Sequence, residues 1–171
     1  VDPETGLTLG EVLEQAQEQN LDLMEMEEGE TASFIATYAS TTTDVSVTRG
    51  SCYYYSDYDL GSYLTYKYTV SFNNVTATAY CIQPSKSSPG DGVFKITRLG
   101  DGKKLAKVCY YGTKASGVNG FFKTEHPDFS AGKQFVITHL AVSYASGSDD
   151  AFSGANANGQ ALAMELYNYC M

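Results

Sequence analysis

The sequence predicts an α+β fold in which an antiparallel sheet forms the body and helices form a subdomain. Two observations carry this prediction. From about residue 31 to residue 98 the chain is rich in β-branched and aromatic residues, and apolar side chains alternate with polar ones. After residue 100, apolar side chains recur at helical spacing in three segments. A chain of 171 residues can bury one core, or a core with a small subdomain.

The N-terminal segment is strongly acidic. Residues 1–30 hold ten acidic side chains and no Lys or Arg, while the rest of the chain is nearly neutral. Leu9, Val12 and Leu13 fall on one helical stripe behind Thr8, a suitable N-cap. We therefore expect an acidic helix or arm over residues 1–30 and a domain over residues 31–171. No basic patch suited to nucleic acid is present.

The clearest strand is SYLTYKYTVSF, residues 62–72. One face is predicted to be apolar and the other polar, which is typical of a half-buried antiparallel strand. The apolar face consists of Leu64, Tyr66, Tyr68, Val70 and Phe72. Asn73-Asn74 is a turn, and VTATAYC returns as the hairpin partner. It ends at Cys81, before a loop rich in Pro, Ser and Gly, and VFKITRL is a further short strand.

Three segments predict helices: DGKKLAKVCYYG, SAGKQFVITHLAVSYASG and GQALAMELYNYC. The second is ambiguous, because the run Val136-Ile137-Thr138 prefers a strand. Its length and its Ser-Gly end favour a helix. The helical part of the domain is thus expected around residues 100–146, with a last helix near the C-terminus.

The four cysteines are widely spaced and form no CxxC pair, so a zinc knuckle is not predicted. No other cofactor or metal site is indicated. Two disulfides in any of three pairings, or four free thiols, fit the spacing equally well. Cys109 lies on an apolar helical face and is expected to be a buried small hydrophobe. Cys170 fits either a core position or a cystine.

Cys81 and His139 are the candidate catalytic residues. Cys81 stands where a strand becomes a loop, and His139 lies inside an apolar run. The simplest interpretation makes Cys81 structural and His139 a hydrogen-bonded core residue. The alternative is a thiol activated by an imidazole, provided that the two meet in the fold. A third group could orient the ring; the possibilities are Asp128, Asn156, Asn158 and Asn168. The other histidine, His126, is expected to be exposed in a loop.

Three motifs, YCIQPSK, LAKVCYYG and THLAVSYASG, resemble those of bacterial thioester domains. These domains are the tip modules of surface adhesins and pilus-tip proteins in Gram-positive bacteria. The resemblance spans roughly residues 31–170. It implies a β-sandwich-like body with a helical subdomain, and a thiol that condenses with a Gln side chain in a Thr-Gln-x-Ala segment. The internal thioester then acylates an amine on a host surface protein.

The resemblance also implies where the protein works. We expect an extracellular module, at the cell surface or anchored in the cell wall, that acts as a monomer within a longer protein. Its partner would be a host or other extracellular surface protein that offers an amine or amide. No apolar run in the sequence is long enough to span a membrane. The start at Val1 and the lack of a signal peptide predict a processed protein or a piece of a longer one.

The sequence departs from the family pattern where the Gln is expected. The segment reads Thr138-His139-Leu140-Ala141, and imidazole has no carboxamide with which a thioester could form. Another Gln could serve, although Gln83 and Gln134 are poorly spaced for it. Cys81 and His139 could instead transfer external acyl groups, as a hydrolase or transamidase. The cleft could also be chemically silent and bind without covalent chemistry, through tyrosines of the stretch 52–66. An adhesin head and a thiol enzyme therefore both remain open.

Overall fold

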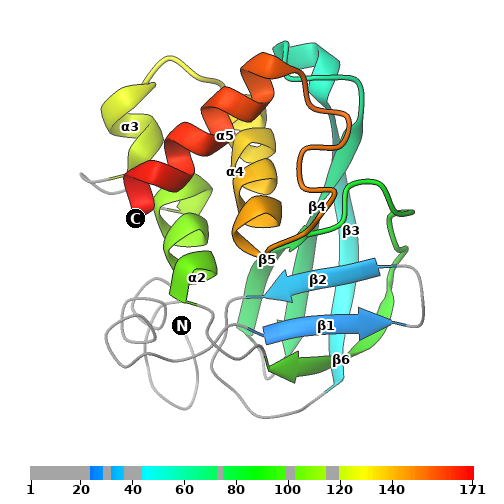
Figure 1. The fold of residues 1–171 in the computed structure, drawn as a ribbon. Helices are drawn as coiled ribbons and strands as arrows, with labels where there is room; N and C mark the ends of the chain where they lie inside the picture. Colours follow the sequence, from blue (N-terminus) through cyan, green and yellow to red (C-terminus); the bar gives the residue numbers. More distant parts are fainter. Residues whose placement is uncertain (1–23, 29–31, 37–43, 73–74, 99–102, 115–119) are drawn as a thin grey trace.

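The computed structural model describes residues 24–28, 32–36, 44–72, 75–98, 103–114 and 120–171. The helix expected near residues 9–16 lies outside this part of the chain. Antiparallel strands occupy one side of the molecule and helices the other, as Figure 1 shows. The predicted α+β class is therefore confirmed. Within the described residues, no helix has the length and apolar character that crossing a membrane requires.

The described strands close into one antiparallel barrel in the order β1-β2-β5-β4-β3-β6. Their bounds are β1 Met24–Glu28, β2 Ala32–Ala36, β3 Asp44–Tyr54, β4 Leu64–Phe72, β5 Val75–Cys81 and β6 Gly92–Arg98. Strand β6 pairs with both β1 and β3, which closes the barrel and leaves no free sheet edge. Because β1 is part of it, the barrel begins within the acidic segment.

The predicted hairpin is formed by β4 and β5, with Tyr68 opposite Ala79 and Phe72 opposite Val75. In the middle of β4 the alternation is as expected, because Tyr68 is fully buried inside the barrel. At the start of the strand it is reversed. Thr65 is 3% exposed and Leu64 is 36% exposed. The reason is that the Thr65 face of β4 is covered here by a helix, because the Thr65 hydroxyl lies against His139 of α4.

The helical layer contains the three predicted helices. Its elements are the 3₁₀ turn η1 Tyr55–Tyr58, α2 Lys103–Cys109, the π-helical turn η2 Tyr110–Lys114, α3 Phe121–Glu125, α4 Ala131–Ala145 and α5 Ala157–Cys170. Helix α4 is central, since it contacts α2, α5, η1, η2 and β5 (Figure 1). Ser130 caps it by accepting a hydrogen bond from the Lys133 amide at 3.3 Å.

Helix α4 is buried along almost its whole length, which explains its ambiguous sequence. Its residues from Phe135 to Ser143 are all buried, including the β-branched run that favoured a strand. A helix covered on all sides shows no amphipathic stripe, and tertiary packing overrides its weak intrinsic propensity.

Replacing Leu140 with Ala is expected to lower the free energy of unfolding by about 2–5 kcal/mol. Leu140 is fully buried in α4, and truncation leaves a cavity between the sheet and the other helices. Urea denaturation followed by circular dichroism measures the loss. The matched control is Leu64→Ala, at the exposed start of β4, for which we expect a loss below about 1 kcal/mol. Equal losses in the two variants would contradict the central place of α4.

Candidate functional site

Cys81 is the last residue of β5 and lies where the sheet meets the helical layer. Its side chain is buried, and the Sγ–H donates a long hydrogen bond of 3.6 Å to the backbone carbonyl of Gln83. Burial raises the pKa of the Cys81 thiol above its ordinary value. The sulfur is not in a cystine, because all four cysteines are free thiols. Cys109 and Cys170 are buried, as expected of core positions.

His139 belongs to α4 and is buried, with 1% of its surface exposed. Its Nδ1 lies 3.4 Å from the Thr65 hydroxyl of β4. Its Nε2 has no hydrogen-bond partner among the residues that the structure describes. Burial lowers the pKa of the imidazole to about 4. The ring is therefore neutral at physiological pH, with one nitrogen unpaired in a dry environment.

One contact from α4 reaches the residue that follows Cys81. Ser143, one helical turn after His139, donates a hydrogen bond of 3.0 Å to the carbonyl of Ile82, the residue after Cys81. The His139 face of α4 thus lies against the end of β5. Tyr55 lies beside His139, with the two ring centroids 6.1 Å apart.

Tyr55 is the second unpartnered polar group of this junction. It opens η1, is fully buried, and its hydroxyl has no hydrogen-bond partner in the described part of the chain. Burial raises its pKa, and the charges of Cys81 and Asp150 act in the same direction. Two buried polar atoms without partners are unusual in a folded core.

Asp150 ties together the two loops beside the thiol. Its carboxylate accepts hydrogen bonds from the Ser85 amide at 2.9 Å and from the hydroxyls of Ser85 and Ser148. Partial burial acts to raise the pKa of Asp150, but these hydrogen bonds outweigh it and hold the pKa below its ordinary value. The charge of Asp150 acts on Cys81 and His139 as well.

Sequence reasoning did not single out Tyr55, Thr65 or Asp150. Of the four residues considered as a third group, Asn156 and Asn158 donate instead to the backbone carbonyl of Asp59, at 3.1 and 2.9 Å. Thr65 contacts the His139 ring in their place. The only signal in the sequence was the polar Thr65 itself, on the strand face that was expected to be solvated.

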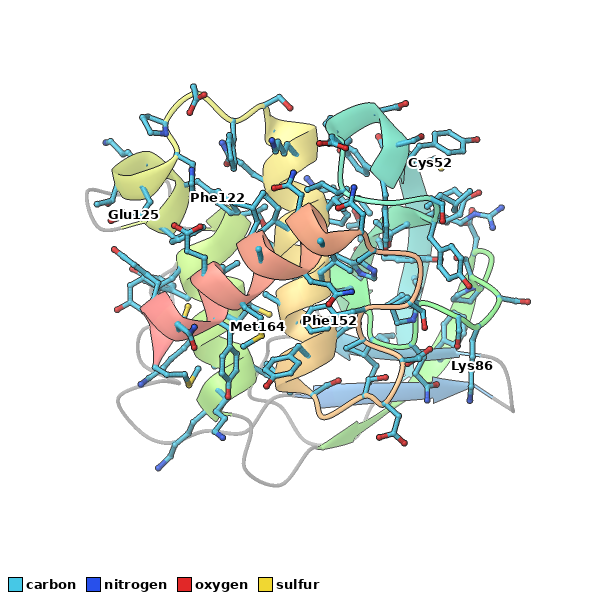
Figure 2. All side chains as sticks on the ribbon, turned by 45° about the horizontal axis from the view of Figure 1, so that its top comes forward. Cys52, Lys86, Phe122, Glu125, Phe152 and Met164 are labelled. Carbon is cyan, nitrogen blue, oxygen red and sulfur yellow. The ribbon has the colours of Figure 1, made fainter. Side chains whose placement is uncertain are left out.

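The expectation that His126 is simply exposed was wrong. Its ring stacks on Phe129 with centroids 4.4 Å apart, and its Nε2 lies 3.2 Å from the Glu165 carboxylate. Only 21% of the side chain is exposed. His126 therefore connects the segment after α3 to α5. Figure 2 shows that α3, labelled by Phe122 and Glu125, lies at the opposite side of the molecule from Cys52 on β3.

Of the two alternative acyl partners within the described residues, Gln134 has its side-chain amide engaged elsewhere and Gln83 contacts Cys81 through its backbone. The side-chain amide of Gln134 donates a hydrogen bond of 2.7 Å to the carbonyl of Phe129, which holds it at the start of α4. Gln83 meets the sulfur through its backbone carbonyl. In the described residues, no group of three His, Cys, Asp or Glu side chains is arranged to hold a metal ion.

The electrostatics define the resting chemistry of the site. Activated cysteine enzymes need a lowered thiol pKa and a protonated imidazole beside it. Here the thiol pKa is raised and the imidazole pKa is lowered, both by burial. The resting pair is a neutral thiol and a neutral imidazole. A neutral imidazole with an unpaired nitrogen can still accept a proton in the course of a reaction.

The fold and the site together define an α+β module with a single strand-end thiol enclosed beneath a central helix. A family model described as "thioester domain" matches residues 44–171, and the chain belongs to this family. The resemblance seen in the sequence motifs is thereby confirmed. The family is typical of extracellular surface proteins. No curated protein and no solved structure matches the chain.

Replacing Asp150 with Asn is expected to raise the rate at which iodoacetamide alkylates Cys81 by on the order of tenfold. The amide cannot accept all the hydrogen bonds that hold the Ser85 loop, which begins just after Cys81, to residue 150. Peptide mass mapping after a timed pulse gives the rate, with Cys109 as an internal reference. Asp149→Asn is the matched control, because Asp149 is exposed and adjacent in sequence. An unchanged rate in Asp150→Asn would show that the carboxylate does not control access.

Proposed function

We propose that the chain is the head module of a bacterial surface adhesin, with a thiol–imidazole site in place of the internal thioester. In this proposal Cys81 keeps the nucleophile of the family, and His139 occupies the position of its acyl partner. The module is exposed outside the cell, as part of a longer wall-anchored protein, and attaches it to a host or other surface protein.

One observation carries the proposal: residue 139, where the resemblance places the family's Gln, is a histidine one helical turn before Ser143, which donates a hydrogen bond to the carbonyl of Ile82. An amide there would condense with the thiol and release ammonia; an imidazole cannot. Cys81 therefore stays a free thiol, in agreement with the absence of a cystine at this sulfur. First contact with a surface is then non-covalent, and any covalent step uses an acyl group brought by the partner.

The unpaired Nε2 of His139 supports a second candidate, a thiol enzyme. In this mechanism the imidazole takes the thiol proton while the sulfur attacks the carbonyl carbon of an external ester or amide. The S–C bond forms and the C–O or C–N bond breaks. The alcohol or amine leaves with the proton returned by the imidazolium. Water or a second amine then releases the acyl group, which amounts to hydrolysis or transamidation.

The experiment coats inert beads with the wild-type module or with Cys81→Ala and measures their retention under flow. The surface is a layer of host cells, and albumin-coated beads set the background. Retention of both proteins supports a binding module without thiol chemistry. Retention of the wild type alone after a denaturing wash supports covalent attachment through Cys81. Retention no higher than that of albumin would overturn the adhesin proposal.

The replacement of the thioester is tested by intact mass. We expect the wild-type mass to equal that of the full sequence and to stay unchanged after treatment with methylamine. A mass lower by one ammonia, which then increases by one methylamine on treatment, would show that some Gln still serves as the acyl partner.

A further inference from the structure

A pocket lies along the seam between the sheet and α4. It has a volume of about 310 Å³, within the range of small-ligand sites. It is bounded by the outer faces of β3, β4 and β5, the first turns of α4 and the π-helical turn η2. Its lining residues are Tyr53, Lys67, Thr78, Thr113, Ala131, Gln134 and Phe135.

This pocket is adjacent to the thiol site but distinct from it. Tyr53 is paired in register with Thr65, the residue that contacts His139, and Phe135 precedes His139 by one helical turn. Yet neither Cys81 nor His139 lines the pocket. Its occupation therefore does not require the thiol.

The charge in the pocket is positive. Lys67 is exposed on β4, and its ammonium group has no hydrogen-bond or ion-pair partner in the part of the chain that the structure describes. None of the seven lining residues carries a carboxylate. The first turn of α4 also opens on the pocket, and the partial positive charge of a helix N-terminus adds to that of Lys67. Lys67 and the N-terminus of α4 together therefore favour a ligand that carries one negative group.

The rest of the lining combines an aromatic wall with short polar groups. The Tyr53 ring packs on Phe135 with centroids 4.9 Å apart, and Phe135 stacks on Tyr80 at 5.3 Å. The Thr113 hydroxyl is fixed by a hydrogen bond of 2.5 Å to Tyr80. The Gln134 amide nitrogen is engaged with Phe129, which orients the side chain and leaves its carbonyl oxygen as an acceptor. Thr78 adds a second hydroxyl.

We propose that this pocket binds an acidic sugar, with the sugar carboxylate on Lys67. The hydroxyls of the ring are matched by Thr78, Thr113 and Gln134, and its apolar face by the wall that Tyr53 and Phe135 form. An acidic side chain of a peptide would satisfy Lys67 but would leave most of these polar groups without a partner. The volume suits one sugar ring. Such a site gives the module a non-covalent hold on a glycan-covered surface.

Isothermal titration calorimetry and saturation-transfer difference NMR test the proposal, with glucuronate and N-acetylneuraminate as probes. Methyl glucoside is the matched neutral sugar, and a Glu-containing tripeptide is the matched acidic peptide. We expect both acidic sugars to bind, more weakly at high salt, and methyl glucoside to bind at least roughly tenfold more weakly because one charged hydrogen bond is lost.

Variants inside and outside the pocket distinguish binding in the pocket from binding elsewhere on the surface. Lys67→Gln removes the charge at an exposed position and is expected to weaken acidic-sugar binding at least roughly tenfold. Lys86→Gln, in the loop between β5 and β6 and away from the helices in Figure 2, is expected to bind like the wild type. Cys81→Ala is also expected to bind normally, so a failure of the thiol proposal would leave this result intact.

Three results would overturn the proposal. One is the absence of acidic-sugar binding to the wild type. The second is equal binding by Lys67→Gln when circular dichroism shows that it is folded. The third is binding of the tripeptide in preference to both acidic sugars.

Discussion

His139→Gln is expected to yield a protein whose intact mass is lower by one ammonia than its sequence requires. The new carboxamide occupies the family's acyl position, on the α4 face that lies against the end of β5. The thiol of Cys81 attacks the amide carbon, the S–C bond forms, the C–N bond breaks, and ammonia leaves with the thiol proton. The enclosed, dry junction around Tyr55 protects the thioester from water.

Two variants control this result. Cys81→Ala combined with His139→Gln has no nucleophile and is expected to show the full mass. His139→Asn carries the same amide on a side chain one methylene shorter and is expected not to condense. Methylamine should open the thioester of His139→Gln, free the thiol and leave an N-methylamide on residue 139, so that the mass rises by one methylamine. A full mass for His139→Gln, in a folded protein, would mean that Cys81 and residue 139 do not meet.

The second large effect is a loss of stability on acidification. The pKa of His139 is about 4 in the folded chain, below the ordinary value of 6.5. As pH falls from 7, the unfolded chain binds the proton first, so stability is complete above pH 6.5 and declines until the folded imidazole is protonated near pH 4. The difference corresponds to roughly 3 kcal/mol of unfolding free energy.

The measurement compares urea denaturation at pH 7 and pH 4.5 in a Cys81→Ala background, so that no thioester can form. Between pH 7 and pH 4.5, the protein with His139 is expected to lose more unfolding free energy than the His139→Gln variant. The difference between the two losses is expected to be most of the roughly 3 kcal/mol. His126→Gln is the matched control and is expected to keep the pH dependence, because His139 remains. Asp150 does not contribute in this pH range, because its pKa is lowered and its stabilisation is lost only below the ordinary value of 3.8. Equal losses with and without His139 would show that the imidazole titrates as in water.

Local patterns in the sequence were sufficient for much of the fold. The alternation in the middle of β4, the pairing of β4 with β5 and the helical spacing in α2 and α5 reflect preferences that act within a few residues. The place of Cys81 at a strand end followed in the same way. Barrel closure could not be predicted, because the pairing of β6 with both β1 and β3 depends on partners distant in the chain.

The contrast between local patterns and partners that are distant in the chain also applies to the site. Thr65 and His139 are separated by 74 residues, and Asp150 meets Ser85 across 65. No spacing rule connects such residues, and each is an ordinary polar residue when considered alone. The chemistry of the pair was also not accessible from sequence. An imidazole near a thiol suggested an activated thiolate, but complete burial makes the neutral forms the stable ones.

The central claim is that the sulfur of Cys81 and the ring of His139 occupy one enclosed junction. NMR of ¹⁵N-labelled histidine side chains tests it most directly, by following the His139 nitrogens from pH 7.5 to pH 4 in the wild type and in Cys81→Ser. We predict a midpoint near pH 4 in the wild type, and a change in the Nε2 shift when the sulfur is replaced. A midpoint near the ordinary value of 6.5, with shifts that do not respond to the replacement, would contradict the account.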